Sequence, residues 1–145
     1  MAARLSTIGY EGKTVEEFLT ELAAAGVELV IDVRAIAASR RPGFSKTALA
    51  AALAERGIGY LHLRALGTPK PGRDAARAGR IADMRRIYEA QLETPEAELA
   101  MEQANEAASE RHSALLCLEA DASCCHRAMT AERLAARGGY QIVNL

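Results

Sequence analysis

The sequence lacks tryptophan and holds few other aromatic residues, which make up 4% of its 145 residues. A surface that stacks nucleic-acid bases on aromatic rings is therefore poorly supported. Charge of one sign is not in excess either, since the sequence has 18 basic and 19 acidic residues and a formal net charge of -1. This balance excludes the whole-protein positive field of a polybasic binder. Any surface that binds nucleic acid must be local.

Long hydrophobic runs are also missing. The longest, at residues 27–33 and 114–118, are far shorter than the roughly 20 residues needed to span a bilayer, so we expect no membrane span. The first residues include no apolar segment of the kind that a secretory signal requires, and we expect a cytoplasmic protein. The length and the 50% hydrophobic content predict one globular domain over residues 1–145.

Short apolar runs alternate with helical patterns along the chain, which is typical of βαβ units. Thr14 with Glu17 predicts a capping box, Ser45 and Thr94 predict further helix starts, and residues 81–92 and 127–137 carry helical patterns. Residues 67–79 are rich in Gly, Pro and Arg and predict a long mobile loop. We predict a single-domain three-layer α/β/α sandwich with a mostly parallel, five-stranded, Rossmann-like sheet. The expected strands are residues 5–9, 27–33, 58–63, 113–118 and 140–145.

Polar residues follow several of the predicted strands. Gly9 and Tyr10 follow the first, Arg34 the second, and Cys117 with Glu119 the fourth. Right-handed crossovers bring the carboxyl ends of parallel strands to one edge of the sheet, and ligands of open α/β sheets bind there. We therefore expect these residues to converge at one site.

Residues 117–127 run from a strand end to a helix start, where backbone N–H groups favour anions and lower the pKa of a thiol. Cys125 is placed for this effect, and His126 and Arg127 beside it further favour an anion. Glu119 is the nearest candidate general base. The candidate catalytic residues are Cys117, Glu119, Cys125 and His126.

Simpler interpretations compete with this one. Cys117 at a strand end also suits core packing, and the residues from Cys125 onward also suit a helix cap. Three cysteines in a reducing compartment do not form a disulfide framework, and Cys124 is expected to face away from the site. A zinc site is not expected, because adjacent residues such as Cys125 and His126 rarely both reach one ion.

A second cluster lies after the second predicted strand. Arg34, Ser39, Arg40 and Arg41 precede the helix start at Ser45. Arginine forms bidentate hydrogen bonds with phosphate, so the cluster suits a phosphate or a nucleic-acid backbone. A solvated run of surface charge is the alternative.

Three motifs together carry a resemblance to a known family. The motifs are Thr7-Ile8-Gly9-Tyr10-Glu11-Gly12, Asp32-Val33-Arg34 through Ser39-Arg40-Arg41-Pro42-Gly43-Phe44-Ser45, and Cys117-x-Glu119 to Cys125-His126-Arg127. Over essentially the whole chain the sequence resembles the uncharacterised bacterial and archaeal family catalogued as domain of unknown function 488. The resemblance implies a compact α/β domain whose motif positions line a common pocket, and it implies no known reaction. The candidate substrate-binding residues are Gly9, Tyr10, Arg34, Ser39, Arg40, Phe44 and Arg127.

A partial likeness to rhodanese-type sulfurtransferases rests on the Asp32-Val33-Arg34 strand end and on Cys117. The charges of Glu119 and Asp121 would oppose a persulfide there, and Ser123 stands where a cysteine phosphatase has its arginine. Both features count against these two enzyme classes.

The favoured hypothesis is an enzyme acting on a phosphate-bearing substrate, a nucleotide or nucleic acid. Arg34, Arg40 and Arg127 would hold the anion, Glu119 would transfer protons, and a cysteine, either Cys117 or Cys125, would be the nucleophile or shape the pocket. The alternatives are a non-catalytic module that binds nucleic acid or a small anion, a rhodanese-like sulfur carrier, and a redox switch of the close thiols. The cofactor, the reaction and the oligomeric state stay open.

Overall fold

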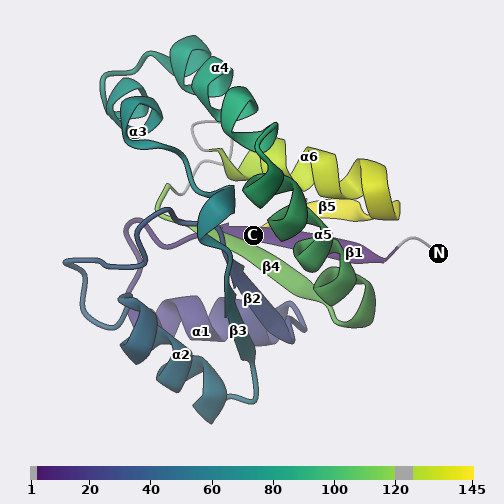
Figure 1. Cartoon of the computed structure of the whole chain (residues 1–145). Helices are drawn as coiled ribbons and strands as arrows, with labels where there is room; N and C mark the ends of the chain where they lie inside the picture. Colours follow the sequence, from purple (N-terminus) through teal and green to yellow (C-terminus); the bar gives the residue numbers. More distant parts are fainter. Residues whose placement is uncertain (1–2, 120–125) are drawn as a thin grey trace.

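The computed structural model describes residues 3–119 and 126–145, and within them five strands form one parallel sheet (Figure 1). The strand order is β3-β2-β4-β1-β5, and every neighbouring pair is parallel. The predicted α/β fold is confirmed. The first strand lies between the fourth and fifth, whereas the dinucleotide-binding Rossmann order places it beside the second. The strands are β1 (Arg4–Gly9), β2 (Leu29–Asp32), β3 (Gly59–His62), β4 (Ser113–Cys117) and β5 (Gln141–Asn144).

Helices cover both faces of the sheet (Figure 1). On one face, α1 (Val15–Ala24) and α2 (Lys46–Glu55) bury Phe18, Leu49 and Leu53 against Val30 and Leu116 of the central strands. On the other face lie α4 (Ile81–Leu92), α5 (Pro95–Glu110) and α6 (Arg127–Gly138), which pack on the alternate side chains of the same strands. Two apolar half-cores thus hold the sheet in place.

Local sequence signals set several helix starts. Thr14 accepts a hydrogen bond from the Glu17 backbone at 3.1 Å, and the Glu17 carboxylate accepts one from the Thr14 backbone at 2.9 Å, so the predicted capping box is confirmed. Thr94 caps α5 in the predicted way, at 3.2 Å from the Ala97 nitrogen. Ser45 precedes α2 as predicted, but its hydroxyl donates to the Ser39 carbonyl oxygen instead of capping the helix.

The prediction of a long mobile loop at residues 67–79 is wrong. This segment contains helix α3 (Lys70–Arg77), which follows the short 3-10 helix η1 (Arg64–Leu66) and packs against α4. Pro71 is favourable in the first turn, and Lys70 pairs with Asp74 one turn later at 2.9 Å. The high Gly and Pro content concealed a helix whose glycine is packed against α4 and whose end is marked by Gly79, with φ of 78°.

No helix within residues 3–119 and 126–145 combines the length and the apolar character that a bilayer span requires.

Candidate functional site

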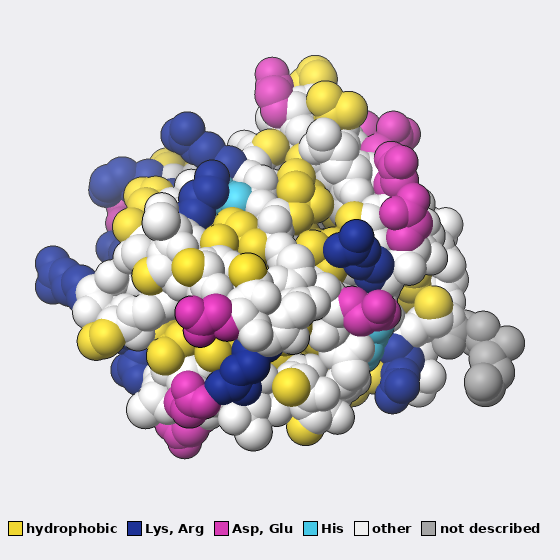
Figure 2. Space-filling view, turned by 90° about the horizontal axis from the view of Figure 1, so that it is seen from below, with side chains coloured by type: hydrophobic (Ala, Val, Ile, Leu, Met, Phe, Trp, Pro, Cys, Tyr) yellow, Lys and Arg dark blue, Asp and Glu magenta, His cyan; other side chains and the backbone are white. Residues whose placement is uncertain are grey.

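A cavity of about 300 Å³ opens at the carboxyl edge of the sheet. Its lining comes from the segments after β1, β2 and β4, from α3 and α4, and from the start of α6. Figure 2 views the molecule from the side of α1 and α2, opposite to α3 and α4 in Figure 1, and on that face several Lys and Arg side chains gather at the left rim. The lining residues are Tyr10, Arg34, Ala35, Ile36, Ala38, Thr68, Arg73, Ala76, Arg77, Met84, Cys117, Leu118, Glu119 and His126.

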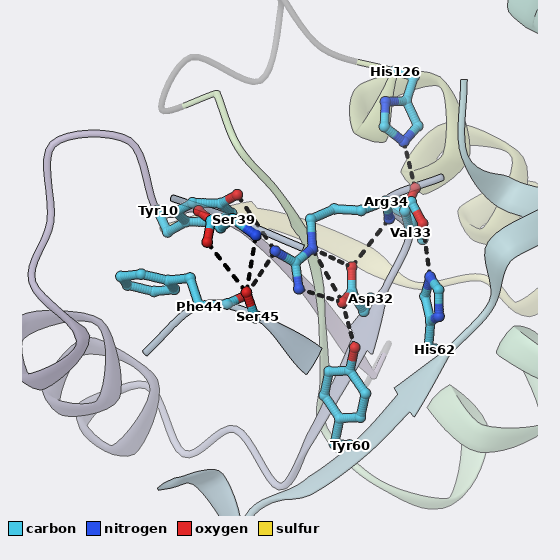
Figure 3. Close-up of polar contacts among 10 residues, drawn as sticks. All are labelled: Tyr10, Asp32, Val33, Arg34, Ser39, Phe44, Ser45, Tyr60, His62 and His126. Carbon is cyan, nitrogen blue, oxygen red and sulfur yellow. Dashed lines mark hydrogen bonds and ion pairs between the residues drawn. The ribbon is translucent and has the colours of Figure 1, made fainter. Parts of the chain in front are cut away.

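Arg34 lines the cavity and is the centre of a buried polar network that continues behind it (Figure 3). Its Nε and Nη2 donate to the fully buried Asp32 carboxylate at 2.9 and 2.8 Å, and its Nη1 donates to the Phe44 carbonyl oxygen at 2.8 Å. Burial alone would lower the pKa of Arg34, but hydrogen bonds and charge from Asp32 outweigh it and raise that pKa. The carboxylate thus balances the Arg34 charge, and this arginine organises the wall more than it attracts a ligand.

Two histidines hold the backbone of the same segment (Figure 3). His126 Nε2 donates to the Val33 carbonyl oxygen at 2.7 Å, and His62 Nε2 donates to that of Arg34 at 2.8 Å. Burial lowers the pKa of His126 to about 4, so the ring is neutral at pH 7. His126 therefore joins α6 to the end of β2 without adding positive charge to the cavity.

Residues 39–45 support the site from behind. Phe44 is fully buried and stacks on Tyr10 with ring centroids 4.5 Å apart, and only Tyr10 of the pair lines the cavity. Ser39 is tied to Ser45, and Arg40 is exposed outside the cavity lining. Of the seven predicted substrate-binding residues, Tyr10 and Arg34 thus line this cavity, whereas the other five do not: Gly9, Ser39, Arg40, Phe44 and Arg127.

Gly9 has a steric role in the structure. A Cβ atom at this position would lie 1.7 Å from the Glu119 carbonyl oxygen and 2.8 Å from Arg127 Nη1. The backbones after β1 and β4 also bond to each other, with the Glu11 nitrogen donating to the Leu118 carbonyl oxygen at 2.8 Å. The absence of a side chain at Gly9 lets the segment that carries Glu119 lie close to β1.

Replacing Gly9 with alanine is expected to displace this segment and to lower the free energy of unfolding by about 1–3 kcal/mol, because the clash is with backbone atoms. Urea denaturation measures the loss. An alanine variant as stable as the wild type would show that the two strand ends do not need this close approach.

Arg127 and Cys117 meet in the interior at the end of β4. Arg127 is fully buried, its Nη1 lies 2.9 Å from Cys117 Sγ, and the same nitrogen donates to the Glu119 carbonyl oxygen. Cys117 is 1% exposed, so its sulfur lies in the interior against Arg127 and away from solvent. Cys125, the other predicted nucleophile, lies outside the described residues, as does Cys124.

Within the described part of the cavity lining, Glu119 carries the carboxylate. Burial raises its pKa, the charge of Glu11 raises it further, and Arg127 and Arg77 lower it. The side chain is half-buried, and it can exchange a proton with a bound molecule. This position fits the acid–base role that the sequence suggested for Glu119, which stays a proposal.

Two arginines of the lining, Arg73 and Arg77, were missed in the sequence because they lie on α3. Nη1 of Arg73 donates to the Thr68 carbonyl oxygen at 2.8 Å, and Arg77 is exposed at the last turn of the helix. Their four-residue spacing is the signal that could have placed them on one side of a helix.

The donor set suits an anion better than a cation. Among the described residues, no group of three His, Cys, Asp or Glu side chains is placed to hold a metal ion. Arginine guanidinium groups instead favour phosphate and carboxylate.

Fold and site together define an α/β protein with an arginine-containing cavity at the carboxyl edge of a parallel sheet. The model of the family described as domain of unknown function DUF488 matches residues 14–134, and the chain belongs to this family. No curated protein matches the chain, and no solved structure does.

Proposed function

We propose that the protein is an enzyme that binds a small phosphate-bearing substrate in this cavity. Arg73 and Arg77 hold the phosphate, and Glu119 gives a proton to the substrate or takes one from it. The observation that carries the proposal is the presence of both arginines and a carboxylate of raised pKa in the lining of one cavity.

The charges around the cavity support an anion. Asp32 neutralises the charge of Arg34 in a buried ion pair at 2.8 Å, and His126 is neutral at pH 7. Neither the ion pair nor His126 therefore adds net charge to the cavity. Among the described residues of the lining, Arg73 and Arg77 are then accompanied by one carboxylate, that of Glu119. A phosphate gains charge-assisted hydrogen bonds from guanidinium groups that it would not gain from neutral donors.

The arginines that hold the phosphate in this proposal differ from those expected from the sequence, which were Arg34, Arg40 and Arg127. Arg34 and Arg127 keep the pocket in shape through internal hydrogen bonds, and Arg40 lies outside it. The volume, at the lower end of the roughly 300–1,000 Å³ of small-molecule sites, favours a small compound over a nucleic-acid strand.

Sulfate binding as a function of pH tests the role of Glu119, since the charge of sulfate stays constant over this range. Ionised Glu119 repels an anion, so the affinity is expected to rise as the pH falls through the raised pKa of Glu119. In Glu119→Gln the affinity is expected to lose this pH dependence. Isothermal titration calorimetry at several pH values measures both, with the exposed Glu89→Gln as the matched control.

An equal pH dependence in Glu119→Gln and the wild type would contradict this role. Turnover is tested by phosphorus NMR of a mixture of small phosphate compounds incubated with the protein. Spectral changes are expected with the wild type and not with Glu119→Gln. Binding of phosphate compounds with no change in any spectrum would favour the non-catalytic anion-binding module.

A further inference from the structure

Exposed large hydrophobic side chains concentrate at the cavity. Among the described residues three are exposed, Ile36 at 60%, Leu99 at 61% and Leu118 at 42%. Ile36 and Leu118 line the cavity, whereas Leu99 lies on α5 outside it. Single exposed hydrophobic residues are ordinary on a protein surface, and Ile36 and Leu118 differ from Leu99 in that both line one cavity.

The fold brings these two side chains to the same place. Ile36 follows β2 and Leu118 follows β4, and these strands are neighbours in the sheet. Ala35, Ala38 and Met84 add further apolar surface to the lining. The cavity therefore has an apolar part from the strand ends, in addition to the arginines of α3.

The close approach at Gly67 fixes the distance between the parts of this lining. A Cβ atom at Gly67 would lie 2.3 Å from the Ala35 Cα, so the chain leading to α3 lies directly against the segment that carries Ile36. Thr68, the next residue, is itself in the lining and accepts the hydrogen bond from Arg73 through its carbonyl oxygen. Cationic and apolar groups thus face one space of about 300 Å³.

We infer that the substrate is a phosphate monoester with an apolar ester group, either a single ring or a short hydrocarbon. Its phosphate lies at Arg73 and Arg77, and its apolar group covers Ile36 and Leu118. Removing these side chains from water favours an apolar group over a polar one of the same size. The inference rests on the proposed function, because it assumes that the arginines hold phosphate.

Isothermal titration calorimetry with phenyl phosphate, glycerol phosphate and inorganic phosphate tests this class. Phenyl phosphate is expected to bind on the order of tenfold more tightly than glycerol phosphate. Ile36→Ser and Leu118→Ser are each expected to reduce that preference and to leave the affinity for inorganic phosphate unchanged. Leu99→Ser, a change at an equally exposed residue outside the cavity, is expected to keep the wild-type preference.

The outcomes separate this inference from the proposed function. Equal affinity for phenyl and glycerol phosphate, with phosphate still bound, would overturn the apolar ester group and keep the anion site. A preference that persists in Ile36→Ser and Leu118→Ser, or that Leu99→Ser reduces equally, would also overturn it. If none of the three compounds binds to the wild type, the proposed function fails as well.

Discussion

Replacing Asp32 with alanine is expected to lower the free energy of unfolding by about 3–5 kcal/mol, because it leaves the charge of Arg34 buried without its partner. Asp32 accepts hydrogen bonds from Nε and Nη2 of Arg34, from the Arg34 backbone nitrogen and from the Tyr60 hydroxyl. All of these donors would lose their acceptor together. Urea denaturation at pH 7 measures the loss.

Asp74→Ala is the matched control for this prediction. Asp74 pairs with Lys70 at 2.9 Å, but both side chains are exposed, and such pairs contribute less than about 1 kcal/mol. A second variant, Asp32→Ala combined with Arg34→Met, removes both charges and is expected to be more stable than the sum of the single changes predicts. If Asp32→Ala costs no more than Asp74→Ala, the buried network does not stabilise the end of β2.

The free energy of unfolding is expected to fall in acid because of His126. Burial lowers the pKa of His126 from 6.5 to about 4, so the unfolded chain binds a proton at this residue before the folded chain does. The contribution of the neutral His126 ring to the free energy of unfolding is fully present above pH 6.5, and it is lost as the pH falls toward 4. Each pKa unit corresponds to about 1.4 kcal/mol, and the expected loss is roughly 3 kcal/mol over this interval.

His126→Gln isolates this contribution, because its amide can still donate to the Val33 carbonyl oxygen and does not titrate. The free energy of unfolding of wild type and variant is measured between pH 4 and pH 7. The wild-type curve is expected to fall more steeply below pH 6.5, whatever the other titrating groups contribute to both. Parallel curves would show that His126 is not held neutral by burial.

Much of the sheet could be predicted from the sequence because its strands are apolar runs bounded by clear signals. The run at residues 27–33 predicted a buried central strand, and β2 (Leu29–Asp32) is fully buried between β3 and β4. Four of the five predicted strands extended one or two residues beyond the observed strand at one or both ends, since the hydrophobic pattern continues past the last hydrogen-bonded residue, and the first strand began one residue earlier than predicted. The strand order could not be deduced, because the pattern that marks a buried strand does not specify its neighbours.

The site could be predicted only in part. Tyr10, Arg34, Cys117 and Glu119 do lie in one cavity lining, as their places at strand ends suggested, and His126 joins them from the start of α6. The role of each residue depends on contacts that the sequence pattern does not show. Arg34 is bound by the neighbouring Asp32 carboxylate and by the Phe44 carbonyl oxygen, and His126 is bound by the carbonyl oxygen of Val33, 93 residues earlier. Arg73 and Arg77 were hidden because α3 has the composition of a loop, and its packing against α4 outweighs the low helix propensity of Gly72 and Pro71.

Phosphate binding by Arg73 and Arg77 in this cavity is what we propose. Isothermal titration calorimetry with phenyl phosphate tests it most directly, on the wild type, Arg73→Gln, Arg77→Gln and Arg85→Gln. Arg85 is exposed on α4 outside the lining and controls for net charge. We expect about tenfold or greater loss of affinity in each of the first two variants and no loss in Arg85→Gln, since charge-assisted hydrogen bonds contribute about 1.5–3 kcal/mol each. No binding to the wild type at millimolar concentration, or an equal loss in Arg85→Gln, would contradict the account.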